Sequence, residues 1–290
     1  MIFDTHAAIL DRLVRERLEK KLDTISNYYL PQALEGHITG GIWTYGGEDV
    51  ETTVNHILAE INAVEEIHVV KSKDDWDIAA FNVILGLQVL NQEASIHQVY
   101  EQGFRHAAIA LKENEFATRE GLTREGRKLV NYMNSLGMVI DVTGASNELL
   151  LEVVHETEQP LVATSANCYE LMPSGANLSD DQLKTIADTG GFVGITTSLK
   201  EIHPSKPSIE TLVDHIDYLR EKVGSSHIAL GFNFNHDLKY KTPTLEGCRK
   251  PSQAIHVIDE LYKRNYTSSE IEAIASTNAK RVINSILLPN

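Results

Sequence analysis

The sequence predicts an α/β fold, a single (β/α)8 or TIM barrel in which eight parallel strands alternate with helices. Short runs rich in Val, Ile and Leu alternate with longer amphipathic stretches, as in a parallel sheet covered by helices. The 290 residues, 42% of them hydrophobic, suffice for one barrel core and show no linker or repeat. The absence of a GxGxxG turn disfavours an open doubly wound sheet that binds a dinucleotide. We therefore expect one domain over residues 1–290.

Each expected strand is a short apolar run that ends at a turn or helix signal. The eight runs are IFDTH (2–6), GGIWTY (40–45), NVILGLQ (82–88), HAAIAL (106–111), MVIDVT (138–143), LVATSA (161–166), FVGITT (192–197) and IALGFNF (228–234). The segment EIHVVKS (66–72) is predicted to be an extra edge strand or an extended connection.

Three stretches between or after these runs have the periodicity of amphipathic helices. The stretch 122–137 ends at Gly137 and places four apolar residues on one face: Leu129, Val130, Met133 and Leu136. The stretch 209–224 ends at Gly224 and carries a similar stripe: Leu212, Ile216 and Leu219. The third, 268–284, is expected to begin with a serine cap.

Charge and cysteine content restrict the partners and the location of the protein. The chain has 26 Lys and Arg against 41 Asp and Glu, a net charge of −15, which disfavours nucleic acid and membrane surfaces as partners. No apolar run approaches the roughly 18–20 residues that span a bilayer, and the first ten residues lack the basic region of a secretory signal. With two cysteines and no CxxC motif, the expected location is the reducing cytoplasm.

In a (β/α)8 barrel the functional residues lie at the carboxyl ends of the strands. That rule selects a set of candidate pocket residues: His6, Ala8, Gln88, Lys112, Glu113, Thr143, Gly144, Ala166, Asn167, Thr197, Asn233 and Asn235.

Several long motifs resemble those of the membrane (renal) dipeptidases, metallopeptidases with a (β/α)8 barrel related to the amidohydrolases. They are GLTREGRKLVNYMNSLGMVIDV (121–142), QPLVATSAN (159–167), NLSDDQLKTIADTGGFVGIT (177–196), HIDYLREKVGSSHIALGFNFN (215–235) and RNYTSSEIEAIASTNAKRVI (264–283). The resemblance covers nearly the whole chain. It implies a barrel with two zinc ions, a bridging carboxylate and an activated water.

The same resemblance implies that most of the metal ligands are missing here. The first-strand motif His-x-Asp reads His6, Ala7, Ala8, and the bridging Glu falls at Gln88. The two metal-binding His of later motifs fall at Gly144 and Ala166. His6 would be the only ligand retained of five, so neither a metal nor another cofactor is expected.

Positions that handle substrate in the family also differ. Lys112 and Glu113 replace its Thr and His, and Asn233 and Asn235 replace two Asp residues. The sequence thus predicts a dipeptidase-like pseudoenzyme with a binding or regulatory role. A small peptide-like ligand is expected, with homodimerisation or pairing with an active relative. The alternative is a hydrolase or lyase for a small amide with a rebuilt mononuclear or metal-free site that uses Lys112, Glu113 and His6.

Several single residues each allow two interpretations. His6 either ligates a single metal with Glu113, Cys168 or His236, or is a hydrogen-bonded histidine at a strand end. Cys168 is either a nucleophile or a buried thiol, and the Lys112–Glu113 pair is either an acid/base pair or a surface ion pair or helix cap. Two further pairs are expected to be structural: His215 and Asp217 by packing, Asp4 and Asp141 by satisfying buried backbone groups.

Overall fold

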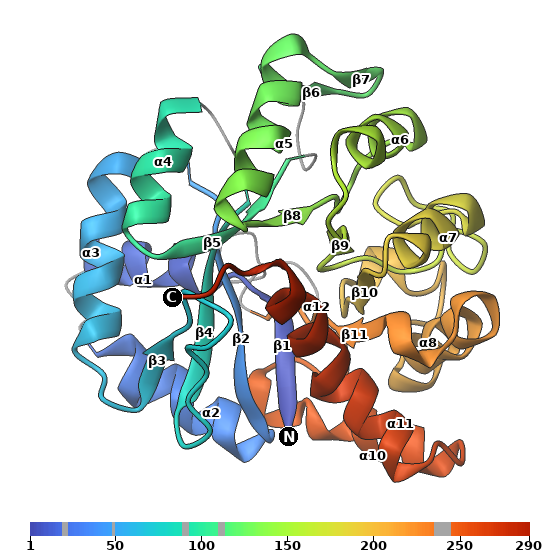
Figure 1. The fold of residues 1–290 in the computed structure, drawn as a ribbon. Coiled ribbons are helices and arrows are strands. Elements are labelled where there is room, and N and C mark those ends of the chain that lie inside the picture. The colour runs from blue at the N-terminus through green and yellow to red at the C-terminus, as the bar shows by residue number, and fades with distance from the viewer. Residues whose placement is uncertain (19–22, 48–49, 89–92, 110–113, 235–244) are drawn as a thin grey trace.

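The structure is a computed structural model that describes residues 1–18, 23–47, 50–88, 93–109, 114–234 and 245–290. Its centre is a closed ring of parallel strands, in the neighbour order β2-β1-β11-β10-β9-β8-β5-β4, which the pairing of β2 with β4 closes (Figure 1). The strands are β1 (Ile2–Ala7), β2 (Ile38–Tyr45), β4 (Phe81–Leu87), β5 (Phe104–Ala108), β8 (Val139–Asp141), β9 (Val162–Ala163), β10 (Phe192–Ile195) and β11 (Ile228–Leu230). The predicted barrel and all eight strand positions are confirmed.

Two smaller strand pairs lie beside the ring. The segment predicted as an extra edge strand forms β3 (Ile67–Val69), which pairs with the first part of β4. A short hairpin joins β6 (Ala117–Thr118) to β7 (Gly121–Leu122).

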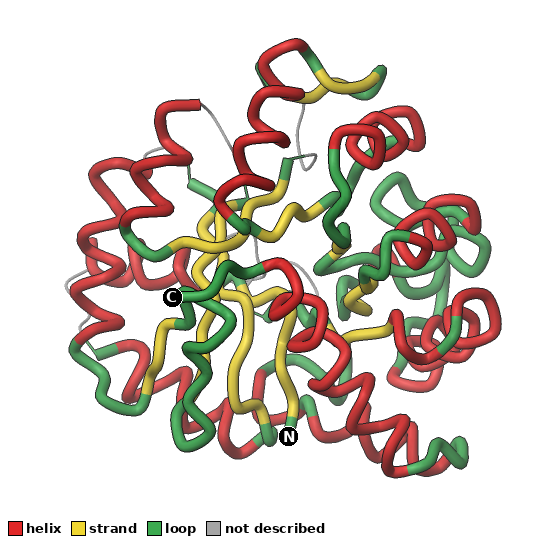
Figure 2. The backbone as a smooth tube through the Cα atoms, in the orientation of Figure 1, coloured by secondary structure: helices red, strands yellow, loops and turns green. Residues whose placement is uncertain are grey.

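Helices surround the ring (Figure 2). They are α1 (Ile9–Leu18), α2 (Leu30–Glu35), α3 (Val50–Asn62), α4 (Glu93–Glu101), α5 (Arg124–Leu136), α6 (Asn147–Glu156), α7 (Asp180–Asp188), α8 (Ile209–Val223), α10 (Ile255–Lys263), α11 (Ser268–Glu272) and α12 (Asn278–Ile286). Among the residues described, no helix is long and apolar enough to cross a membrane.

Two predicted helices form as expected. The Thr123 hydroxyl accepts a hydrogen bond from the Gly126 N–H at the start of α5, and Gly137 ends the helix with φ 64°, a backbone conformation that glycine adopts without steric cost. α8 ends at Gly224 and buries the predicted stripe.

The third predicted helix needs a correction. Residues 268–284 form α11, a five-residue π-helical segment (Ala273–Thr277) and α12 rather than one regular helix. The N-cap is Thr267, whose hydroxyl forms a capping box with Glu270, and Ser268 is already the first helical residue.

The core has two layers. The larger cluster lies between the ring and the helices. The smaller one fills one end of the barrel, where side chains from seven strands face inward and meet apolar residues of α12. The strand residues are Phe3, Ile42, Ile84, Val139, Val162, Phe192 and Ala229. Because α12 packs against this cluster, it closes the amino end of the barrel and leaves the carboxyl end for the polar residues.

Candidate functional site

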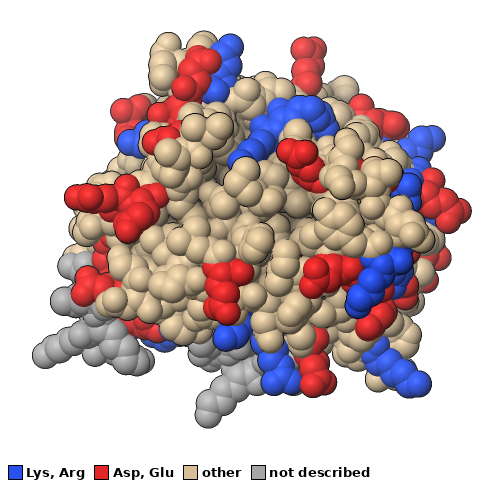
Figure 3. All heavy atoms as spheres, turned by 90° about the horizontal axis from the view of Figure 1, so that it is seen from below, with Lys and Arg blue, Asp and Glu red and all other residues tan. Residues whose placement is uncertain are grey.

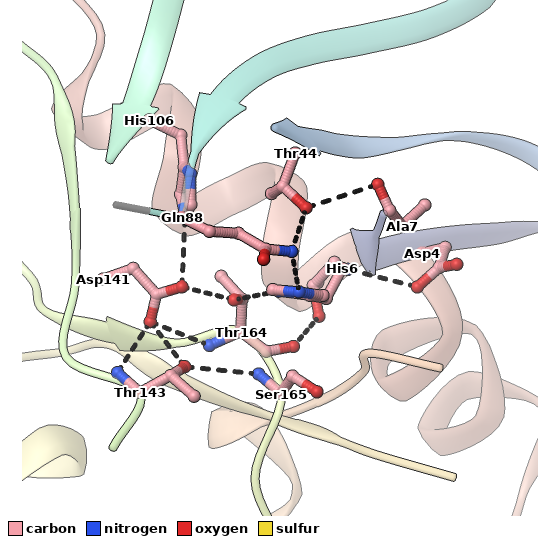
Figure 4. A network of polar contacts seen from close by, with 11 residues as sticks. Asp4, His6, Ala7, Thr44, Gln88, His106, Asp141, Thr143, Thr164 and Ser165 are labelled. Carbon is pink, nitrogen blue, oxygen red and sulfur yellow. Dashed lines mark hydrogen bonds and ion pairs between the residues drawn. The ribbon is translucent and has the colours of Figure 1, made fainter. Parts of the chain in front are cut away.

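His6, near the end of β1, lies at the centre of a polar network inside the carboxyl end of the barrel (Figure 4). Only 3% of the residue is exposed. Its Nδ1 is 2.9 Å from Thr164 Oγ1, and its Nε2 is 3.0 Å from the Gln88 amide nitrogen. That amide also donates to Thr44 Oγ1 at 2.8 Å. Gln88, from the segment after β4, and Thr164, from the segment after β9, therefore contact the imidazole, and Thr44 of β2 is linked to it through Gln88.

For a neutral His6, the hydrogen-bond directions indicate which nitrogen carries the proton. An amide nitrogen only donates, so His6 Nε2 accepts from Gln88 and the proton resides on Nδ1. His6 Nδ1 then donates to Thr164 Oγ1, which in turn donates to Asp141 Oδ2. The reverse amide orientation around a neutral His6 would require the single Thr164 hydroxyl proton to serve two acceptors. The Nε2 lone pair of a neutral His6 is therefore occupied by an amide N–H.

Asp141, at the end of β8, receives hydrogen bonds on both carboxylate oxygens. Oδ1 accepts from the Thr143 N–H at 2.8 Å, the Thr143 hydroxyl at 2.6 Å and the Thr164 N–H at 3.3 Å. Oδ2 accepts from Thr164 Oγ1 and from His106 Nε2, the latter at 3.1 Å. Burial alone would raise the pKa of Asp141, but the hydrogen bonds and the charge of His106 outweigh burial and lower this pKa to about 2.

His106, on β5, was not predicted from the sequence as a site residue. It is fully buried and pairs with Asp141 inside the barrel. Its Nδ1 has no hydrogen-bond partner among the described residues, and a Cβ added at Gly86 would lie 2.3 Å from that atom. The glycine of β4 therefore leaves the space that the imidazole ring occupies. The sequence signal that could have revealed this pair is a histidine and an aspartate on two strands that are neighbours in the barrel.

Asp4 lies on the other side of His6 and has fewer hydrogen bonds than Asp141. Its Oδ1 accepts from the His6 N–H at 3.1 Å and the Phe232 N–H at 3.0 Å, which confirms its predicted contact with buried backbone. Its Oδ2 has no partner among the described residues. Because burial outweighs these hydrogen bonds, the pKa of Asp4 rises to about 8.

Cys168 and His215 are buried and have structural roles. The Cys168 thiol is buried, and burial raises its pKa well above the usual value, which suppresses the thiolate that a nucleophile needs. His215, in the middle of α8, accepts from the Cys168 N–H at 3.1 Å and donates to the Ile202 carbonyl at 2.8 Å. The predicted packing role of His215 is confirmed. Asp217 accepts from Arg264 and Tyr266 on the outer surface.

Comparison with known proteins places this geometry in a family. The profile of the family described as "Membrane dipeptidase (Peptidase family M19)" matches residues 1–288. The chain belongs to the membrane dipeptidase family. Its curated relatives include an uncharacterized protein of the pqqA 5' region of Klebsiella pneumoniae, 37% identical over 41% of the chain and 45% of that protein. Dipeptidase tcpJ of Claviceps purpurea is 24% identical over 69% of the chain and 49% of that protein. The matched part spans less than half the length of these two relatives.

Solved structures agree on the fold of this membrane dipeptidase family member. The dipeptidase AC structure superposes with a TM-score of 0.87 at 19% identity and covers 99% of this chain and 98% of that one. A metallo peptidase from Rhodobacter sphaeroides, liganded with a phosphinate mimic of the dipeptide L-Ala-D-Ala, gives a TM-score of 0.85 at 19% identity over 98% and 99% of the two chains. At this identity the likeness concerns the fold.

The remaining candidate pocket residues of this membrane dipeptidase relative differ in their surroundings. Ala8 is buried, and Gly144 is an exposed residue with φ 81°. Ala166 is fully buried in the larger hydrophobic cluster, whereas the preceding Ser165 contacts the Gly231 carbonyl at 3.5 Å. Thr197 donates to the Phe232 carbonyl at 2.6 Å.

The two asparagines in the described part of the candidate set have different roles. Asn167 is fully buried and holds backbone, because its side chain bonds both the N–H and the carbonyl of Thr196. Asn233 has φ 58°, and its Oδ1 has no partner among the described residues. Lys112, Glu113, Asn235 and His236 lie outside the described residues. Within the described part of the chain, no three His, Cys, Asp or Glu side chains are grouped closely enough to hold a metal ion.

Proposed function

We propose that this member of the membrane dipeptidase family is a pseudoenzyme for zinc-dependent dipeptide hydrolysis and acts by binding at the carboxyl end of its barrel. The observation that carries the proposal is the state of His6. Its Nε2 accepts from Gln88 and its Nδ1 donates to Thr164, so the imidazole is committed to protein partners. A zinc ligand must direct a lone pair at the metal.

The neighbouring residue types support the same proposal. Gln88 presents an amide N–H to His6, and an amide carries no negative charge with which to bridge two dications. Ala8 and Gly144 have no donor atom in their side chains. These residues do not fit the two-zinc centre that the family resemblance implies. The ligand we propose is a small peptide-like molecule, and the partner is a second copy of the chain or an active relative.

An activity assay tests this function. The purified protein, supplied with zinc or treated with a chelator, is incubated with a panel of dipeptides beside an active membrane dipeptidase. We expect no zinc-dependent hydrolysis, because too few ligands remain to hold the metal pair. Hydrolysis that requires zinc and that His6→Ala abolishes would contradict the proposal. Hydrolysis that persists with the chelator would instead assign a rebuilt, metal-free active site and equally overturn the pseudoenzyme.

A further inference from the structure

A pocket of about 930 Å³ lies at the amino end of the barrel, the end opposite to His6. Ile2, the first residue of β1, and Asn82, the second residue of β4, contribute to its lining, together with α10, α11, α12 and the segment before β4. Its size is within the range of about 300–1,000 Å³ that is typical of small-molecule sites. Uncharged residues make up most of the surface seen from below, the side of Figure 1 on which the N-terminus, α10 and α11 lie (Figure 3).

The walls of this pocket are largely apolar. Trp76 and Ile78 line one side, and Ile258 and Tyr262 of α10 line another. Ile78 is fully exposed and Tyr262 is 53% exposed. Exposure of the apolar side chains around this pocket to water is unfavourable. A ligand that covers them stabilises the complex by roughly 25 cal/mol per Å² of apolar area removed from solvent.

Lys280 of α12 is the one half-buried cation among the described residues that line the pocket. Its Nζ lies 5.7 Å from the ring centres of both Phe3 and Trp76. Among the described residues no carboxylate forms an ion pair with it. Burial lowers its pKa, because removal of the ammonium group from water disfavours its charged form.

The acidic residues of the same lining form no ion pair with Lys280 among the described residues. Asp77 and Glu272 are exposed, and Asp77 Oδ1 accepts from the Ala79 N–H at 2.8 Å. Arg281 is also exposed and donates to the Ser226 carbonyl at 2.9 Å. Among the described charged residues of the lining, Lys280 is therefore the one that is half-buried, beside two aromatic rings and apolar walls, whereas the charges of Asp77, Glu272 and Arg281 are exposed to water.

We propose that this pocket binds an amphipathic carboxylate, with the carboxylate group at Lys280 and the apolar body against Trp76 and α10. The ligand supplies the anion that the lysine lacks and covers the apolar walls at the same time. The site is separate from the carboxyl end of the barrel, and it does not depend on whether the protein hydrolyses dipeptides.

Octanoate and its neutral analogue octanamide test this site on the full chain, with affinities measured by calorimetry. We expect octanoate to bind and octanamide to bind at least about tenfold more weakly, because a hydrogen bond to a charged group contributes about 1.5–3 kcal/mol. Lys280→Gln should weaken octanoate by a similar factor, whereas Lys280→Arg should retain most of the affinity. Lys128→Gln, on the exposed pair with Glu125, is the matched control and should leave binding unchanged.

Tryptophan fluorescence locates the bound probe. The chain has two tryptophans, and Trp43 is fully buried in the core. Octanoate should change the emission of the wild type, and Trp76→Phe should remove that change. Equal affinities for octanoate and octanamide, an unaffected Lys280→Gln variant, or no binding of octanoate would each overturn the proposal. Self-association that Ile78→Ser abolishes, in a chain that does not bind octanoate, would assign the surface to a second copy and overturn it as well.

Discussion

Replacing Asp141 with alanine is expected to destabilise the protein by about 3–5 kcal/mol, because it removes the acceptor of several buried donors, each of which costs about 1–3 kcal/mol when left unsatisfied. The carboxylate accepts bonds from the Thr143 and Thr164 backbones and hydroxyls and from His106. Its removal leaves those buried donors without an acceptor, and each unsatisfied group adds its own desolvation cost. Urea denaturation at pH 7 measures the free energy of unfolding of both proteins.

The pH dependence of the free energy of unfolding distinguishes the loss of the Asp141 charge from a loss of packing. The pKa of Asp141 is lowered from 3.8 to about 2 in the folded protein, so its stabilisation is complete above pH 4 and is lost as the pH falls towards 2. The difference between wild type and Asp141→Ala should shrink by about 2 kcal/mol over that range. Asp180→Ala, which removes a surface pair with Lys222, should cost less than about 1 kcal/mol. Equal stability of Asp141→Ala and wild type at pH 7 would contradict the network.

Asp4→Asn is expected to have the opposite effect and to stabilise the protein at pH 8. The asparagine Oδ1 can still accept from the His6 and Phe232 backbones, while the cost of a buried charge disappears. In the wild type the folded pKa is about 8 against 3.8 for the free group, so stability falls as the pH rises from 4 to 8. The variant should therefore gain up to about 5 kcal/mol relative to wild type across this range.

Measurements of the free energy of unfolding at pH 4.5 and pH 8 test this prediction. The titrating groups that both proteins share cancel in the comparison. Near-equal stabilities at pH 4.5 and a more stable variant at pH 8 are expected. The same stability difference at both pH values would show that Asp4 does not titrate in this range.

The fold was predictable because its signals are local. Each barrel strand is a short apolar run, and Thr123 and Gly137 mark the two ends of α5. The π-helical segment between α11 and α12 was not predictable, because it is a rare change from i→i+4 to i→i+5 hydrogen bonding over a short segment that no residue type marks. The Thr267 cap was missed because Ser268 is an equally good cap by residue type.

The strand-end rule predicted that His6 and Gln88 lie at the carboxyl end of the barrel, and residue type predicted the role of the buried acids. Asp4 and Asp141 were predicted to be buried acids that bind backbone, and both do so. The pairs His106–Asp141 and His6–Gln88 depend on which side chains face inward on strands that are 35 and 82 residues apart in sequence. Spacing along the chain does not carry that information. The pocket around Lys280 was missed for the same reason, because four segments that are distant in the sequence form it.

The pseudoenzyme proposal requires that His6 and its neighbours cannot hold two zinc ions. Crystals of the protein soaked in zinc, with anomalous diffraction recorded at the zinc edge, test this requirement most directly. We expect no pair of zinc peaks at the carboxyl end of the barrel, with Gln88 still donating to His6. Two peaks about 3.5–4 Å apart, one of them at about 2.0–2.1 Å from a His6 nitrogen, would contradict it.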